Sequence, residues 1–317
     1  MTETVSIREV GLRDGLQLVE TYLPTETKLS WCKEEAAAGF TEIEVTSFVP
    51  PSILPQFADA AVVLGGAQEI GGLLPSVLVP NLKGAIRALD AGAKKISFVL
   101  SASEAHNQSN VRCSTDASLT MFRELLEERK ARELQDTVQI AGAIATSFGC
   151  SIQGHVPETR IIEIAAAMAS AGADEVNLAD TVGYANPRQV SRIFEQADTV
   201  VGPVPLAAHF HDTRGMGLAN VVAAYDTGVR RFDASLGGLG GCPFAPGASG
   251  NIATEDCVYL LENLGVNTGI DLSALLRLRA KLTDWLSGEE MSGKLLLAGP
   301  AKTFAPNCPV VMTGTHT

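Results

Sequence analysis

Two histidines that lie two positions apart, His209 and His211, have the side-chain type and the spacing of a metal site. They end an apolar run, 206–211, that predicts a strand, and side chains at i and i+2 of a strand point to the same face. Two imidazoles side by side offer two nitrogen ligands to a divalent ion. The alternative is a pair of core histidines with backbone partners. We favour the metal, with Asp14 as the natural carboxylate ligand, although an aspartate before Gly15 is also common in turns.

The available donors indicate a hard divalent ion, Mg²⁺ or Mn²⁺. Two nitrogens with carboxylate and water oxygens suit such an ion, whereas structural zinc usually takes thiolates. The six cysteines form no Cys-x-x-Cys pair, which argues against a zinc ribbon and against a disulfide scaffold. Scattered, reduced thiols are typical of a cytoplasmic protein. These cysteines are Cys32, Cys113, Cys150, Cys242, Cys257 and Cys308.

One of these thiols, Cys242, follows a segment in which residues 237, 238, 240 and 241 are glycine. The segment is either a flexible linker with a buried cysteine or a mobile catalytic lid that carries a proton donor into a closed site. We favour the lid, because a linker gains nothing from a lone thiol. A cysteine near its ordinary pKa of about 8.5 is mostly protonated at neutral pH and can act as an acid.

Short β-branched runs alternate with longer amphipathic stretches, which predicts eight strand–helix units. The class is therefore α/β, and a closed (β/α)8 TIM barrel fits better than an open doubly wound sheet, because no Gly-x-Gly-x-x-Gly turn follows an early strand. The predicted strands are 5–10, 42–47, 74–79, 95–100, 138–145, 175–180, 206–211 and 232–236. The predicted helices are 25–38, 57–64, 82–91, 114–134, 158–171, 187–197, 216–227 and 254–264.

Barrel enzymes carry their chemistry at the C-terminal ends of the strands. The first predicted strand ends in the segment 11–15, which contains Arg13 and Asp14, and the second carries Glu44. The sixth ends at Asp180, and the seventh and eighth lead to the two histidines and to the glycine–cysteine segment. Polar residues at so many strand ends predict one site at the mouth of the barrel.

The chain of 317 residues is 46% hydrophobic and 19% charged, with a formal net charge of −12. This acidity argues against a nucleic-acid partner but leaves room for a local basic pocket. No basic and apolar leader begins the sequence and no uncharged apolar run reaches the roughly 18 residues of a membrane span, so we expect a cytoplasmic protein without membrane contact. We expect the barrel over 1–270 and a short C-terminal helical extension and tail over 271–317, packed on the barrel or partly disordered. After Gly288 we expect loop.

Several motifs resemble those of 3-hydroxy-3-methylglutaryl-CoA (HMG-CoA) lyases. The glycine–cysteine segment followed by Gly-Ala-Ser-Gly-Asn is the most specific, together with His-Phe-His-Asp-Thr. The resemblance runs from about Ile7 to Asn267, nearly the whole predicted barrel. The matching segments are 9–17, 44–49, 80–84, 180–183, 209–213 and 237–251.

The resemblance implies a metal-dependent carbon–carbon lyase that splits a 3-hydroxyacyl-CoA by a retro-Claisen route. Its products are acetyl-CoA and a keto acid, which is acetoacetate for HMG-CoA. The residues implied as metal ligands are Asp14, His209, His211 and Asn251. Those implied in catalysis are Arg13, which stabilises charge on the thioester oxygen, Cys242 as the acid, and Glu44, Asp180, Asp14 and His209. We expect Arg13, Gln17, Ser47 and Asn177 to contact the substrate.

Three departures from the lyase pattern concern the acyl pocket. Leu18-Val19-Glu20 follows Gln17, where the lyases show asparagine and charged residues. Asn177 replaces a serine and Ala179 a glycine, and 151–155 differs from the usual Pro-Tyr-Glu-Gly. A sibling lyase acting on citramalyl-CoA or on a branched 3-hydroxy-3-alkylglutaryl-CoA is therefore the alternative.

Two further alternatives and two partner predictions remain. A Claisen-type synthase of the isopropylmalate or homocitrate kind usually carries a long C-terminal domain, and we disfavour it because the expected extension over 271–317 is short and the glycine–cysteine segment is present. A non-catalytic barrel that binds a CoA ester is disfavoured by the intact ligand set. We expect a CoA-thioester substrate and a homo-oligomer, with a dimer possible. Candidate cations for the CoA phosphates, or otherwise solvated surface residues, are Lys83, Lys94, Lys95 and Arg112.

Overall fold

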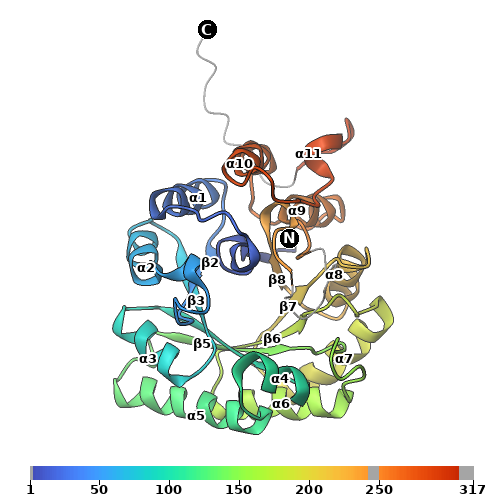
Figure 1. Cartoon of the computed structure of the whole chain (residues 1–317). Coiled ribbons are helices and arrows are strands. Elements are labelled where there is room, and N and C mark those ends of the chain that lie inside the picture. The colour runs from blue at the N-terminus through green and yellow to red at the C-terminus, as the bar shows by residue number, and fades with distance from the viewer. Residues whose placement is uncertain (1–2, 242–249, 307–317) are drawn as a thin grey trace.

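Eight parallel strands close into a barrel in the order β1 to β8, in a computed structural model that describes residues 3–241 and 250–306 (Figure 1). The predicted (β/α)8 TIM barrel is therefore confirmed. Strands β2, β3 and β6 begin and end at the predicted residues, and the other five differ from the prediction by one or two residues at their ends. The strands are β1 Ser6–Glu9, β2 Glu42–Ser47, β3 Leu74–Val79, β4 Lys95–Ser101, β5 Gln139–Ala145, β6 Glu175–Asp180, β7 Leu206–Phe210 and β8 Arg231–Ala234.

Helices surround the barrel and cover the outer faces of its strands (Figure 1). Apolar residues fill the layer between strands and helices, as in the edge-on contact of Phe98 with Phe122. No helix in the described part of the chain is both long and apolar enough to cross a membrane. The helices are α1 Thr25–Ala37, α2 Ala60–Gln68, α3 Leu82–Asp90, α4 Glu104–Val111, α5 Thr115–Ala131, α6 Glu158–Ala171, α7 Pro187–Val201, α8 Gly217–Asp226, α9 Thr254–Asn263, α10 Leu272–Trp285 and α11 Leu295–Ala298.

Three of these helices differ from the sequence prediction in existence or position. Helix α4 was not expected, because its sequence is polar and has no apolar stripe; the hydroxyl of Ser103 caps it by accepting from the His106 amide. Helix α2 lies three to four residues later than predicted, since Pro55 starts a separate 3₁₀ turn over Pro55–Phe57. The segment after Gly288, predicted as loop, contains the short helix α11.

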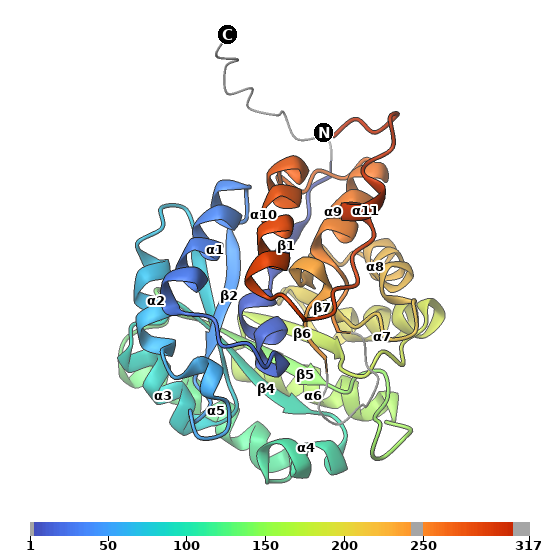
Figure 2. The same ribbon diagram turned by 45° about the horizontal axis from the view of Figure 1, so that its top comes forward.

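The C-terminal extension packs against the barrel through α10. Its leucines Leu275, Leu278 and Leu282 are buried, as their helical spacing predicts. Figure 2 shows α10 between α1 and α9. Arg279 of α10 reaches the carboxylate of Glu255 in α9, so the extension is joined to the barrel by an ion pair as well as by apolar contact.

Charged side chains fill the interior of the barrel near the N-terminal ends of its strands, which we call the barrel floor. Branched aliphatic residues are usual inside such barrels. Glu175 of β6 accepts from Arg8 of β1 at 2.9 Å and from Lys95 of β4 at 2.9 Å. Glu42 of β2 contacts the same two cations. Lys95 is thus buried at the N-terminal end of its strand, and Lys94 precedes it. Lys95 is therefore engaged in buried ion pairs rather than free to bind a phosphate, whereas Lys94 is exposed.

Candidate metal and substrate site

Asp14 and Arg13 lie in a single π-helical turn, η1 (Gly11–Gly15), that follows β1. The carbonyl oxygen of Val10 accepts from the amides of Arg13, Asp14 and Gly15 at 3.0, 2.7 and 3.3 Å. Such turns are rare and are frequently found at functional sites. Here the turn points two consecutive side chains into the same cavity.

A buried carboxylate behind this turn holds it in place. Glu9 accepts from the amides of Gly11 and Leu236 and from the hydroxyl of Thr254. A Cβ at Gly11 would lie 2.7 Å from the Glu9 carboxylate and 2.9 Å from the Trp31 ring, so a larger residue would force one of these buried side chains to move. Burial raises the pKa of Glu9 to about 8. Burial and the nearby charge of Glu9 raise the pKa of Glu35, which accepts from the Trp31 indole, well above its ordinary value.

The two histidines and Asp14 converge on one point at the mouth of the barrel. The Nε2 atoms of His209 and His211 lie 3.1 Å apart, and Oδ2 of Asp14 lies 3.9 and 3.5 Å from them. An octahedral ion with bonds of about 2.1 Å separates neighbouring ligand atoms by about 3.0 Å and opposite ones by about 4.2 Å. The three distances fall in this range, so these side chains could hold a divalent ion.

Asn251 completes this arrangement. An isolated antiparallel bridge pairs it with His211, and its amide nitrogen donates to Oδ2 of Asp14 at 2.7 Å and to the carbonyl of Leu239 at 2.9 Å. Its Oδ1 is buried and has no hydrogen-bond partner in the part of the chain that the structure describes. An amide oxygen is a good ligand for a hard cation, so this donor set fits a divalent ion. Without the family resemblance, Asn251 would not have been predicted as a ligand, because an asparagine after glycine usually indicates a turn.

The site is strongly charged even without an ion. Burial alone would raise the pKa of Asp14, but the charge of Arg13 and the two histidines hold it well below its usual range. Burial would lower the pKa of His209, yet the hydrogen bond to Asp233 and the charge of Asp14 raise it. Asp14 is therefore ionised at neutral pH and able to bind a cation.

A cavity of about 500 Å³ lies beside these residues. A β-bulge between Glu44 and Thr46 brings Glu44 and Ser47 to the same lining, although residues three apart on a regular strand face opposite sides. The residues singled out from the sequence that line the cavity are Arg13, Asp14, Gln17, Leu18, Glu44, Ser47, Arg112, Asn177, Ala179, His209 and His211.

Arg13 is held between two carboxylates. Its Nε donates to Glu44, and its Nη1 donates to Oδ1 of Asp14 at 2.5 Å. The same oxygen accepts from the side-chain amide of Gln17 at 3.1 Å. Burial opposes the charged form of Arg13, but the two carboxylates raise its pKa, so the guanidinium stays a permanent cation at the cavity wall.

Other predicted residues lie elsewhere. Asp180 is buried next to the cavity, where its two oxygens accept from the amides of Tyr184 and Ala185. Its carboxylate thus orders the loop after β6. Lys83 is exposed near the start of α3. Cys242 lies outside the described residues.

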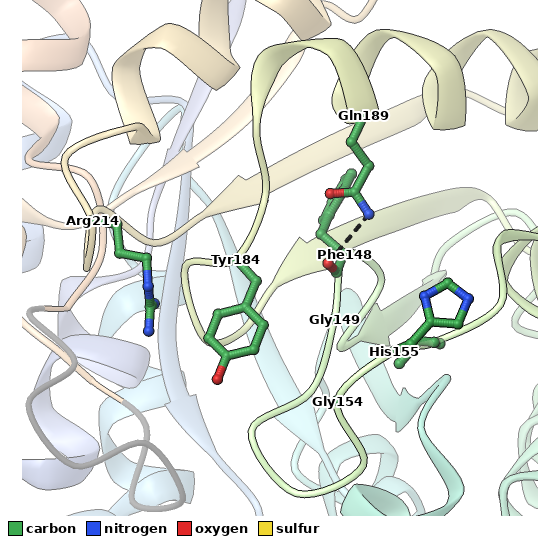
Figure 3. A pocket seen from close by; sticks show the side chains of 8 residues that line it. Phe148, Gly149, Gly154, His155, Tyr184, Gln189 and Arg214 are labelled. Atoms are coloured by element: carbon green, nitrogen blue, oxygen red, sulfur yellow. Dashed lines mark hydrogen bonds between the residues drawn. The ribbon is translucent and has the colours of Figure 1, made fainter.

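The segment 151–155, expected to shape the acyl pocket, lines a different pocket of about 420 Å³. Gly154 and His155 contribute to it, and none of the five residues lines the metal cavity. Figure 3 shows Tyr184 and Arg214 beside each other at this second pocket, with the guanidinium 4.5 Å from the ring centre.

Comparison with known proteins identifies the family. The family model described as HMGL-like matches residues 4–282. The hydroxymethylglutaryl-CoA lyase YngG of Bacillus subtilis is 40% identical over 95% of this chain and 97% of its own length. A mitochondrial hydroxymethylglutaryl-CoA lyase of Macaca fascicularis is also 40% identical, over 87% and 84%.

A solved structure agrees with these sequence matches. An HMG-CoA lyase from Acinetobacter baumannii, in complex with coenzyme A and 3-methylmalate, superposes with a TM-score of 0.89. It is 42% identical and covers 96% of this chain and 97% of its own. Members of the family depend on a divalent metal, which agrees with the Asp14, His209 and His211 group. The resemblance inferred from the sequence is confirmed, and the chain belongs to the HMGL-like family.

Proposed function

We propose that this protein is a divalent-metal-dependent lyase that cleaves HMG-CoA, or a close 3-hydroxyacyl-CoA, to acetyl-CoA and a keto acid. The observation that carries the proposal is the convergence of Asp14, His209 and His211 beside the Arg13 guanidinium, at a cavity of about 500 Å³. The names and the extent of the matching relatives support the same reaction. With HMG-CoA the keto acid is acetoacetate.

The ion is Mg²⁺ or Mn²⁺, held by Asp14, His209, His211 and the Oδ1 atom of Asn251. When bound, it supplies Lewis-acid chemistry that lowers the pKa of the substrate's tertiary hydroxyl. The absence of a thiolate in the described donor set supports a hard ion over structural zinc.

Arg13 and Cys242 serve the two ends of the reaction. A base takes the proton of the C3 hydroxyl, the C3–O bond becomes the carbonyl of the keto acid as the C2–C3 bond breaks, and the electron pair of that bond becomes the enolate of acetyl-CoA. The Arg13 guanidinium stabilises the negative charge on the thioester oxygen of this enolate. The Cys242 thiol then gives its proton to C2, which completes the acetyl methyl group. Glu44 and Asp14 hold Arg13 in place for this task.

The remaining polar residues orient the substrate or the loops around it. Gln17 and Ser47 line the cavity next to Arg13 and are proposed to contact the acyl group. Asp180 supports the site by ordering the loop after β6. Arg112 also lines the cavity and is the remaining candidate there for the CoA phosphates. A cytoplasmic location and a homo-oligomer stay predictions.

A panel of CoA esters, assayed with metal-loaded and chelator-treated protein, tests this function. We expect cleavage of HMG-CoA or of citramalyl-CoA only with metal, with release of acetyl-CoA in both cases and of acetoacetate or pyruvate, respectively, as the keto acid. The His209→Ala variant should lose both Mn²⁺ binding and turnover and keep its fold, because the site lies at the barrel mouth. Equal turnover with and without metal, or no cleavage of any ester, would contradict the proposal.

A further inference from the structure

The buried carboxylate of Asp233 on β8 contacts His209 at Nδ1, the ring nitrogen that does not face the metal site. Its Oδ2 lies 3.2 Å from Nδ1 of His209. His211 has no such partner: its Nδ1 is buried and makes no hydrogen bond within residues 3–241 and 250–306. The two histidines are therefore held differently, although their sequence spacing treats them alike.

The contact fixes the tautomer of His209. An imidazole that offers the lone pair of Nε2 to a cation carries its proton on Nδ1, and that proton needs an acceptor. His209 is buried, so the acceptor has to come from the protein. Oδ2 of Asp233 is in the required position.

Asp233 is itself held by donors from two other strands. Nε and Nη2 of Arg8 on β1 lie 2.8 and 2.7 Å from its Oδ1. The amide nitrogen of Asn177 on β6 donates to its Oδ2 at 2.7 Å. Both oxygens of the carboxylate are thus engaged, and the charge of Arg8 lowers the pKa of Asp233 against the opposing effect of burial.

Arg8 connects this pair to the floor of the barrel. Its Nη1 lies 2.9 Å from Glu175 and 3.1 Å from Glu42. Two carboxylates therefore hold the guanidinium at Nη1, while its Nε and Nη2 face Asp233. Five charged or polar side chains from four strands form one connected hydrogen-bond network that reaches His209 through Asp233: Glu42, Glu175, Arg8, Asp233 and Asn177.

We propose that Asp233 is the positioning residue of His209, and that Arg8 and Asn177 act by holding Asp233. The inference rests on the proposed metal site and adds residues to it. It also gives Asn177 a role other than substrate selection, because its amide nitrogen is committed to Asp233. Outer-shell partners of this kind typically change metal affinity or activity by about 10–100-fold when they are removed.

The test compares Asp233→Asn with Glu42→Gln, using Mn²⁺ titration calorimetry on the purified full-length protein. Both variants remove one carboxylate from Arg8, but only Asp233 touches His209. We expect about 10–100-fold weaker Mn²⁺ binding for Asp233→Asn and a much smaller loss for Glu42→Gln, because Glu175 still holds Arg8 in that variant. Thermal unfolding of each variant shows whether the barrel is intact.

Asn177→Ala covers the case in which Asp233→Asn does not fold, since it removes only one hydrogen bond to the carboxylate. It should weaken Mn²⁺ binding and lower kcat for every cleaved ester by the same factor. A change confined to the ratio between esters would make Asn177 a selectivity residue and overturn its positioning role.

Other outcomes decide between this inference and the proposed function. Wild-type Mn²⁺ affinity in folded Asp233→Asn, or an equal loss in Glu42→Gln, would overturn the positioning role. If Asp233→Asn alone lost Mn²⁺ affinity but the wild-type protein cleaved no ester, the lyase function would be refuted and the positioning role of Asp233 would stand. Absence of Mn²⁺ binding by the wild type would overturn both.

Discussion

Replacing Gly240 by alanine tests why glycines precede Cys242. Gly240 has φ +114°, and a Cβ on it would lie 2.6 Å from the amide nitrogen of Asn251 and 3.0 Å from the carbonyl oxygen of Asp14. Real Cβ atoms essentially never come closer than 3.0 Å to such atoms, so Asn251 or the glycine segment has to move. The glycine thus allows the backbone to lie directly against two proposed metal ligands.

The size of the effect follows from this contact. Relieving it displaces the Asn251 amide by most of an ångström, and a misplacement of about 1 Å in an active site can cost on the order of 10²-fold in rate. The positive φ adds strain of about 1–3 kcal/mol to the folded state, whatever the space available. We therefore expect a modest loss of stability together with a large loss of turnover and of Mn²⁺ affinity.

Gly228→Ala is the matched control. Gly228 has φ +99°, and a Cβ there would meet no heavy atom within 4 Å. Urea unfolding should show a similar loss of stability in the two variants, whereas calorimetry with Mn²⁺ and the lyase assay should separate them. If Gly240→Ala bound Mn²⁺ and turned over like Gly228→Ala, the close approach to the ligands would have no functional meaning.

Three further predictions concern charge, the thiol and pH. Arg13→Met should lower kcat by at least about 10²–10³-fold with little change in ester binding, because the charge that Arg13 meets develops in the transition state; a rise in KM alone would make it an anchor. Cys242→Ala should abolish cleavage and keep Mn²⁺ binding, and mass-spectrometric mapping should place inactivating alkylation at Cys242 rather than at another thiol. Glu9 and Glu35 both have raised pKa values in the folded state, so their contribution to stability is full below the ordinary carboxyl pKa of 4.5 and declines as pH rises above it; for Glu9 it is lost as pH passes through about 8. Glu35→Gln should reduce this decline in urea unfolding experiments, and an unchanged decline would assign it to other groups.

Features with a short sequence period could be predicted from the sequence. Strand and helix patterns repeat every two and 3.6 residues, so the barrel class and the strands β2, β3 and β6 followed from local reading. The shared face of His209 and His211 has the same origin. Asn251 was found through the family motif alone, since no local pattern separates a ligand from a turn asparagine.

Features that depend on contacts between distant strands required the tertiary structure. The bulge in β2 brings Glu44 and Ser47 to one cavity, and no residue type at that position indicates a bulge in the sequence. From the sequence, Lys95 was a candidate phosphate ligand or a solvated surface lysine. In the structure it is buried between Glu42 and Glu175 at the N-terminal end of the barrel.

Asp233 shows the same limit at the proposed metal site. It lies 24 positions from His209, 56 from Asn177 and 225 from Arg8 along the chain. Sequence spacing does not reveal these contacts, because they depend on the register of β8 against β7 and on the closure of the barrel, which brings β1 next to β8. The sequence by itself therefore determined which side chains could bind a metal, and the tertiary structure decided which of them are held in place, and by what.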